Sequence, residues 1–298
     1  MHGKLSIVRI GKEQERGTAA TTALTSPFVG AGWKFPRQQY LAKIKSSGTF
    51  PSPTASVALG LTARVTGAPE VNVATIRDII LMAMMRTAGV LPSFTFEQNL
   101  VGQEKISGCV CSSLELTFQR SATPDEGAIL SATMEFAAMK VAAATGIVAG
   151  QYAVGRYFPM ALSIFTLDDV IAAAVQSWTW KHTNLLPAGY HKSDLSIDHI
   201  GDGDEIDEFT VLARGATAAW RALVSAGTEV ATSMVFATGT ANETVTLAMG
   251  KTRLGDHDPQ GDDTVLEQIT FSPVHTGVAR PVAVSFGSAI GASVLGLS

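Results

Sequence analysis

The sequence has little charge and no long apolar segment. Asp, Glu, Lys and Arg make up 16% of the 298 residues, well below the ~25% typical of soluble proteins. The chain therefore has few charges with which to cover an isolated monomer. No apolar run approaches the ~18–20 residues that a membrane-spanning helix needs, and the C-terminal stretch 288–297 is too short. Together these absences favour a subunit whose faces are covered by other copies over a membrane protein.

A basic excess, a signal peptide and a cysteine framework are also missing. The formal net charge is −4 and the Lys and Arg residues are scattered, which argues against strong or specific nucleic-acid binding. The N-terminus, MHGKLSIVRIGKEQERG, has no apolar signal region, so we expect a protein made in the cytoplasm. The two cysteines, Cys109 and Cys111, lie two apart on a predicted strand, where a disulfide would be strained. We expect packed, reduced thiols.

No catalytic, cofactor-binding or metal-binding residues can be assigned from motifs. Gly250-Lys251-Thr252 is the nearest approach to a phosphate-binding loop, but Val245 stands where that loop needs its first glycine. A loop, RLGDHDPQG, follows where a helix is required. We interpret this segment as a strand-to-loop turn.

The histidines do not form a recognisable metal site. They are His2, His182, His191, His199, His257 and His275, and none follows the i, i+4 spacing of a helix-borne zinc site. Around His257, oxygen ligands for calcium could come from Asp256, Asp258, Asp262 and Asp263. The bidentate Glu that ends a calcium loop is missing, so a solvated loop is favoured.

Alternation with period two runs through most of the chain and predicts antiparallel strands with one buried face. It is clearest in SFTFEQNL, where Phe94 and Phe96 alternate with Thr95 and Glu97. The predicted fold class is therefore mainly β. The other regular strands are SSLELTFQ, LSATMEF, TVTLAM and VLEQITF, and the less regular ones are QQYLAKIK, SVALGLTARV, LSIFTL, SDLSIDHI, FTVLAR, TSMVFAT and PVAVSF.

Two segments have helical spacing instead. NVATIRDIILMAMMRTAG has Asn72 as its expected N-cap and Gly89 as the expected residue after its C-cap, and ATAAWRALVSAG stops at Gly227. Each has a single apolar stripe, so each is expected to pack on a sheet. The stripes are Ile76, Ile79, Ile80, Ala83 and Met84 in the first segment, and Ala216, Ala219, Trp220, Leu223 and Val224 in the second.

A short internal echo suggests a duplicated domain. Ser93-Phe-Thr-Phe, followed by Asn99-Leu100, resembles Ser177-Trp-Thr-Trp, followed by Asn184-Leu185, about 84 residues later. The Ala- and Gly-rich stretch VAAATGIVAGQYAVG is a suitable join near residue 150. The predicted domains are residues 1–150, with an N-terminal arm, and residues 151–298, with a C-terminal arm.

The order of these segments resembles the tail tube proteins of long-tailed bacteriophages, in a family that carries two tube domains per chain. The matching covers about residues 5–275 and is closest at the Gly108-Cys109 strand and at the Trp178/Trp180 strand ending in Asn184. The acidic loops GDGDEIDE and GDHDPQGDD have no counterpart that we can align. The matched segments are IGKEQERGTAA, ARVTGAPEVNVATIRDIILMAMM, SFTFEQ, SGCVCSSLELTF, LSATMEF, IFTLDDV and VQSWTWKHTNLL.

The resemblance implies a structural subunit and no enzyme. Each domain would be an antiparallel β-sandwich or half-barrel flanked by a short helix, with no cofactor and no catalytic or metal residues. Copies would form rings, three chains in a pseudo-sixfold ring being favoured over six chains, and the rings would stack into a tube for DNA ejection. Other partners would be the tape measure protein, the tail terminator and the distal initiator proteins. The location would be the phage tail, assembled in the host bacterial cytoplasm.

A tube that conducts DNA should not bind it, because every neutralised phosphate adds affinity. We therefore expect the polar faces of the strands to line the lumen or another hydrated surface. The residues concerned are Thr95, Glu97, Glu115, Thr117, Thr133 and Glu135.

The alternative function is a β-sandwich binding module, such as a carbohydrate-binding or receptor-binding tail component. It would use Trp178 and Trp180 as an exposed sugar-stacking pair, whereas their alternation with polar residues favours a buried core face. An enzyme ranks third.

Overall fold

The fold is mainly β, as the alternation predicted. In the part of the chain that the structure describes, one antiparallel sheet of 15 strands is accompanied by a separate two-stranded sheet. The computed structural model describes residues 7–20, 24–28, 32–44, 55–99, 102–119, 128–148, 152–167, 170–171, 175–190, 197–214, 222–223, 225–260, 266–274 and 280–298.

The two sheets together contain 17 strands among the described residues. In chain order they are β1 (Val8–Lys12), β2 (Arg37–Ile44), β3 (Ala55–Gly67), β4 (Ser93–Gln98), β5 (Glu104–Gln119), β6 (Ser131–Ala138), β7 (Lys140–Ala143), β8 (Ile164–Leu167), β9 (Val170–Ile171), β10 (Val175–Asn184), β11 (Ala188–Tyr190), β12 (Ile197–Ile200), β13 (Glu205–Arg214), β14 (Glu229–Ala237), β15 (Thr244–Gln260), β16 (Leu266–Pro273) and β17 (Ala283–Phe286). The helix α1 (Ile76–Met84) follows β3, and the short 3₁₀ helix η1 (Met160–Leu162) precedes β8.

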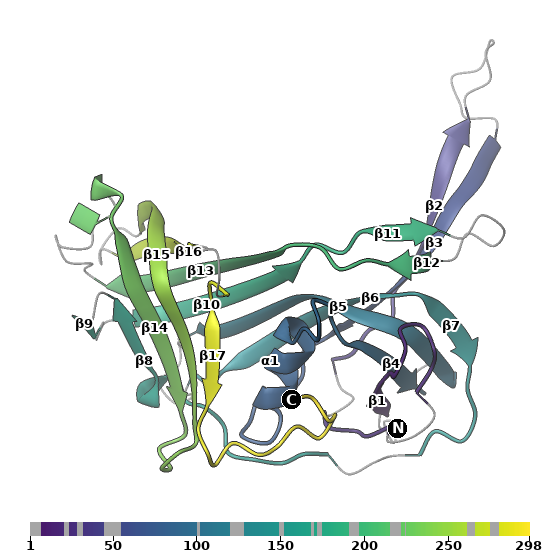
Figure 1. The fold of residues 1–298 in the computed structure, drawn as a ribbon, viewed down its shortest axis with the longest axis horizontal. Coiled ribbons are helices and arrows are strands. Elements are labelled where there is room, and N and C mark those ends of the chain that lie inside the picture. Colours follow the sequence, from purple (N-terminus) through teal and green to yellow (C-terminus); the bar gives the residue numbers. More distant parts are fainter. Residues whose placement is uncertain are drawn as a thin grey trace.

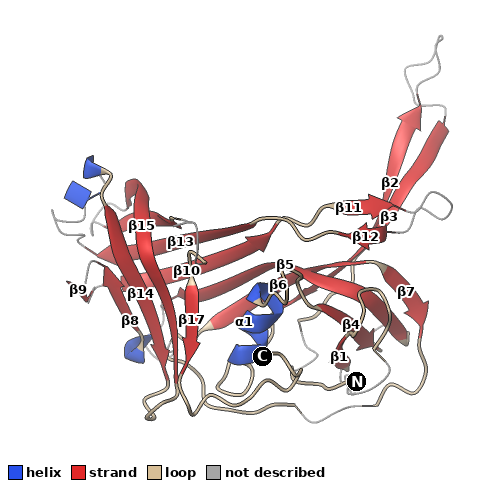
Figure 2. Ribbon diagram, in the orientation of Figure 1, coloured by secondary structure: helices blue, strands red, loops and turns tan. Residues whose placement is uncertain are grey.

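The large sheet curves around α1. Its main path runs β2-β3-β6-β5-β10-β13-β16-β15-β14-β8-β9, while β1, β4, β7 and β17 attach beside it. Figures 1 and 2 show α1 beneath the middle of the sheet, with β14, β15 and β17 to one side and β1 and β4 to the other. The buried apolar residues of α1 and of these strands form one continuous core. The hairpin β2–β3 projects away from this body (Figure 1).

Every segment that the alternation predicted as a strand contains one. Because the side-chain period of a strand is two, a half-buried strand is visible in sequence without knowledge of its partners. The strands that alternation did not reveal are β1, β7, β9 and β11, none of which is longer than five residues. The predicted join near residue 150 is irregular in its described residues 144–148 and 152–155, after β7, and the domain boundary there stays a prediction.

The first predicted helix exists, with different ends. It begins at Ile76 after a turn at Asn72, with Thr75 as N-cap, and ends at Met84. Gly89 lies in the following turn, at φ 83°, so neither predicted cap residue caps the helix. α1 lies against β5 and β10, as its single apolar stripe predicted. Of the second predicted helix, residues 216–221 and 224 lie outside the described residues, while 222–223 and 225–226 are helical.

The two similar sequences that suggested a duplication lie on strands with different positions in the sheet. β4 lies between β1 and β5, whereas β10 lies between β5 and β13. The two aromatic pairs are therefore not equivalent, and the repeat of about 84 residues is wrong.

Candidate functional site

One face of the central sheet carries a continuous polar surface built from neighbouring strands. In one row across the sheet, Thr133 pairs with Glu115, Glu115 with Lys181, and Lys181 with Glu208. Glu115 and Thr133 are exposed, and Thr117 and Glu135 are partly exposed, so the prediction that these four face a hydrated surface is confirmed. We call this surface the polar face. The next row consists of Ser131, Thr117, Thr179, Thr210 and Thr270.

The opposite face of the same strands is buried. Trp178 and Trp180 on β10 are 1% and 0% exposed, which confirms the prediction of core aromatics and leaves no exposed stacking pair at these residues. The Trp180 ring stacks on Phe209 at 6.0 Å between ring centroids. Because successive side chains on a strand alternate, packing Trp178 and Trp180 inward leaves Thr179 and Lys181 on the polar face.

The prediction of a hydrated environment is wrong for Thr95 and Glu97. All six residues of β4 are buried, because the segment that follows β1 covers the face from which Thr95 projects. Thr95 Oγ1 donates a hydrogen bond to Glu13 Oε1 at 2.8 Å and accepts one from the Ala20 amide at 2.8 Å. Glu97 forms ion pairs with Lys105 at 3.0 Å and Arg9 at 3.5 Å.

Glu13 anchors the N-terminal segment by its buried carboxylate. Besides Thr95, the amide of Gly108 donates to Glu13 Oε1 at 2.8 Å and the amide of Gly17 donates to Oε2 at 2.9 Å. Glu13 is 5% exposed. These three donors compensate the carboxylate for its lost hydration.

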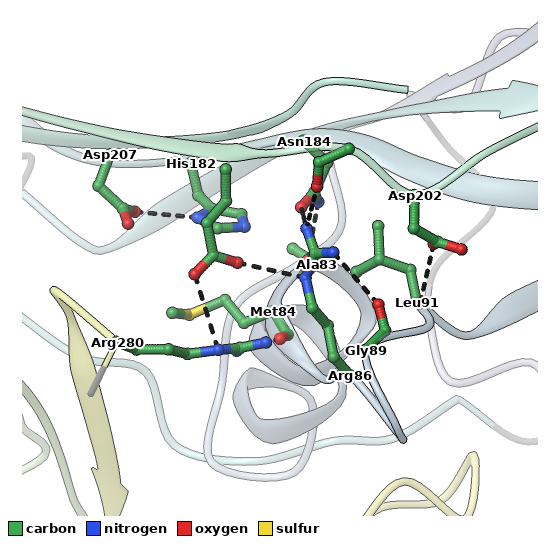
Figure 3. A network of polar contacts seen from close by, with 12 residues as sticks. Ala83, Met84, Arg86, Gly89, Leu91, His182, Asn184, Asp202, Asp207 and Arg280 are labelled. Atoms are coloured by element: carbon green, nitrogen blue, oxygen red, sulfur yellow. Dashed lines mark hydrogen bonds and ion pairs between the residues drawn. The ribbon is translucent and has the colours of Figure 1, made fainter. Parts of the chain in front are cut away.

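A network of polar side chains holds the C-terminal end of α1 against β10 and β13 (Figure 3). The last carbonyls of a helix have no partner inside it, so side chains must satisfy them when they are buried. Asn184 Nδ2 donates to the Ala83 carbonyl at 2.9 Å and to the Cys111 carbonyl at 3.1 Å. Arg280 donates to the Met84 carbonyl. Both arginine and amide donors suit the negative end of the helix dipole.

Glu205 links two arginines within this network. Its carboxylate lies 3.4 Å from Arg86 Nε and 3.7 Å from Arg280 Nε. Arg86 also donates to Asn184 Oδ1 at 3.2 Å and to the Gly203 carbonyl at 3.0 Å. The network therefore connects the end of α1 with β10, β13 and the segment before β17.

Two aspartates of the segment GDGDEIDE, which also contains Glu205, hold distant parts of the chain together. Asp202 accepts hydrogen bonds at 2.8 Å from Arg16 and at 2.9 Å from the Leu91 amide. Burial opposes its ionisation, but these donors outweigh burial and lower the pKa of Asp202. Asp207 Oδ1 accepts from Trp180 Nε1 at 2.8 Å and lies 2.9 Å from His182 Nδ1. The sequence predicted an acidic loop here, which is wrong for Glu205 to Glu208 because they begin β13. The partners of this segment come from distant strands, so the sequence did not reveal them.

The sequence motifs that suggested chemistry occupy strands. Gly250, Lys251 and Thr252 lie inside β15, where Thr252 Oγ1 donates to the Val230 carbonyl at 2.8 Å. The strand-to-loop turn expected there is wrong. The expected solvated loop around His257 is wrong as well, because Gly255 to Gln260 continue β15, while Asp262 and Asp263 lie outside the described residues.

The thiols and histidines show no grouping for metal binding. Among the described residues there is no cluster of three or more His, Cys, Asp or Glu side chains that could hold a metal ion. Cys109 and Cys111 are free and buried, and burial raises the pKa of both thiols. His182 is buried and His199 exposed. His2, His191 and His275 lie outside the described residues.

An ion pair fixes the segment before η1 to the turn between β14 and β15. Arg156 Nε donates to Glu243 Oε2 at 2.9 Å, and the Thr238 hydroxyl donates to the same carboxylate. These hydrogen bonds, that from Arg156 first, lower the pKa of Glu243 from 4.5 to about 2. The folded state thus binds this proton less tightly than the unfolded state does.

We expect this pair to contribute stability above about pH 4.5 and to lose that contribution as the pH falls toward 2. The stability difference between the unchanged protein and Glu243→Gln should be constant at neutral pH and should shrink through this range. Urea unfolding at a series of pH values measures it. Glu229→Gln, on an exposed ion pair with Arg253, is the control, and an equal acid response in both variants would contradict the assignment.

None of the helices in the described residues is long and apolar enough to cross a membrane. No family model matches the chain, and no curated protein matches it either.

Proposed function

We propose that the chain is a structural subunit of a phage tail tube that assembles with copies of itself into stacked rings around a DNA conduit. The observation that carries the proposal is the polar face, a wide hydrated surface on a sheet whose other face is fully packed. Such a sheet already has a complete core, so its second face is free to line a water-filled lumen.

The chemistry of the polar face suits the passage of DNA. Its central rows are mostly threonine and serine, with the carboxylates Glu115, Glu135 and Glu208 against the cations Lys181 and Arg64. Hydroxyls and a small acidic excess offer phosphates no cluster of cations to bind. A polyanion would therefore move along this surface without strong attachment.

The edges of the sheet support self-assembly. Among the described strands, β2 pairs only with β3 and β9 only with β8, so the main path ends in unpaired backbone groups. Open edges favour pairing with another chain, and a closed ring of copies removes them. Three chains per ring, with the tape measure, terminator and initiator proteins as further partners, belong to the same proposal.

Negative-stain electron microscopy of the purified full chain tests the proposal. We expect hollow rings or tubes at high protein concentration, and no shift of duplex DNA in a gel assay with the assembled material. Glu115→Lys with Glu208→Lys should leave assembly intact and create salt-sensitive DNA binding, because the polar face would become cationic. A protein that stays monomeric at all concentrations would contradict the proposal, as would DNA binding by the unchanged tube.

A further inference from the structure

Two parts of the chain repeat one pattern of strand pairing. In residues 8–143 the antiparallel neighbours run β1-β4-β5-β6-β3-β2, with β7 beside the start of β5. In residues 164–286 they run β8-β14-β15-β16-β13-β10, with β17 beside the start of β15. α1 lies between β3 and β4, and the helical residues 222–223 and 225–226 lie between β13 and β14.

The repetition extends to register. Ile106 on β5 pairs with Phe96 and Val141. In the second part, Val245 on β15 pairs with Phe236 and Phe286. A bulge interrupts β5 against β6 between Cys111 and Ser113, and another interrupts β15 against β16 between Leu254 and His257.

The repeat also identifies the counterpart of the tryptophan pair on β10. Lys34 pairs with Thr66 on β3, and in the second repeat Thr179 pairs with Thr210 on β13. Lys34 is therefore the equivalent of Thr179. Its neighbours Trp33 and Phe35 correspond to Trp178 and Trp180. The ring contacts agree, because Trp33 lies 5.3 Å from Phe96 and Trp178 lies 5.2 Å from Phe236. The segment GWKF, not SFTF, is thus the structural equivalent of SWTW.

Within the chain, the two repeats are joined where β10 pairs with the second half of β5, from Thr183 opposite Ser113 to Ser177 opposite Gln119. The equivalent segments at the other ends of the repeats are residues 32–39 and residues 254–260. Among the described residues, no strand pairs with the outer edge of β2. Likewise, β14 ends its pairing with β15 at Arg253, and no described strand pairs with that edge of residues 254–260.

We propose that these two edges pair between copies of the chain, so that residues 35–38 of one copy lie antiparallel to residues 256–259 of the next. The inference rests on the proposed tube function and deepens it by naming the joining strands. Transferring the register of β10 on β5 places Gln38 opposite Asp256 and Arg37 opposite His257. Pro259 has no N–H, so the pairing has one backbone donor fewer there.

The charges of the two edges favour pairing between the β2 edge of one copy and the β15 edge of another. Residues 32–44 contain Lys34, Arg37 and Lys43 and no acidic residue, whereas residues 254–260 contain Asp256 and Asp258 and no Lys or Arg. Opposite charges across neighbouring strands are favourable and like charges are not. The basic edge of one copy therefore attracts the acidic edge of another and repels its own kind. Three chains would then give six equivalent junctions, three within chains and three between them.

Cysteine cross-linking of the full chain tests the register. Facing Cα atoms of an antiparallel pair are close enough for a disulfide, so Gln38→Cys with Asp256→Cys should yield covalent dimers and trimers on a non-reducing gel after mild oxidation. The matched control, Ser113→Cys with Thr183→Cys at the equivalent internal junction, should give only a bond within one chain. The native thiols are buried, so a background reaction should be slow.

Charge reversal gives an independent measure. Ring yield should fall at least tenfold in the double variant Lys34→Glu with Arg37→Glu, and equally in the double variant Asp256→Lys with Asp258→Lys. The variant that carries all four substitutions should recover the yield, because the charges of the two edges are then exchanged. Rings by microscopy without cross-linked multimers would overturn the pairing and leave the tube function standing. Cross-linked multimers without rings would support the pairing and contradict the tube. A chain that forms neither would overturn both.

Discussion

Trp180→Ala is expected to lower the free energy of unfolding by about 3–5 kcal/mol, the usual cost of removing a large buried aromatic side chain. Trp180 is 0% exposed, stacks on Phe209 and donates to Asp207 through Nε1. Its removal would leave a cavity where β10 crosses the core, and it would take one of the hydrogen bonds from a buried carboxylate.

Urea unfolding followed by circular dichroism, below the concentration at which copies associate, measures this loss. Thr179→Val is the matched control, because Thr179 is the next residue on the same strand and belongs to the polar face. Surface substitutions of this kind change stability by about 0.5 kcal/mol or less. Equal effects of the two variants would contradict the assignment of buried and hydrated faces on β10.

Glu13→Ala is expected to lower the free energy of unfolding by roughly 2–4 kcal/mol, because hydrogen bonds to a charged acceptor contribute about 1.5–3 kcal/mol and buried donors left unpaired are costly. The variant leaves the amides of Gly17 and Gly108 and the hydroxyl of Thr95 without their acceptor. We also expect residues 13–20 to exchange their amide hydrogens faster, since this segment would lose its anchor on β4.

Hydrogen exchange by mass spectrometry and urea unfolding check both expectations. Glu15→Ala is the control, because Glu15 lies two residues away and is exposed. If Glu13→Ala were as stable as Glu15→Ala, the buried carboxylate would have no anchoring role.

The strands were predictable because alternation is a local property. Leu114, Leu116 and Phe118 turn inward and Glu115 and Thr117 outward whatever strand lies alongside, since the backbone pleat alone sets the period. The same rule failed for Thr95 and Glu97 because it assumes that a polar residue marks a face in water. Here the N-terminal segment brings Glu13 onto that face, and a buried polar residue with partners looks in sequence like an exposed one.

The polar network at the end of α1 was not predictable. Arg86, Asn184, Glu205 and Arg280 come from four separate segments of the chain, and no spacing rule connects them. The nearest signal was the acidic composition of GDGDEIDE, which indicated charge without its partners. The helix caps failed for a related reason, because the carbonyl of Ala83 is satisfied by Asn184 from another strand rather than by a local glycine.

Local patterns in the sequence were enough to predict a mainly β protein that is low in charge, with Trp178 and Trp180 in its core and a helix from the segment 72–89 against its sheet. Which strands are neighbours could be learned only from the folded chain, since an aromatic pair two residues apart is too short a pattern to define a repeat. The pairing register of the strands shows which residues are equivalent in the two repeats. It matches Trp178 with Trp33 and Phe236 with Phe96, because equivalence in a sheet depends on strand pairing and not on similarity along the chain.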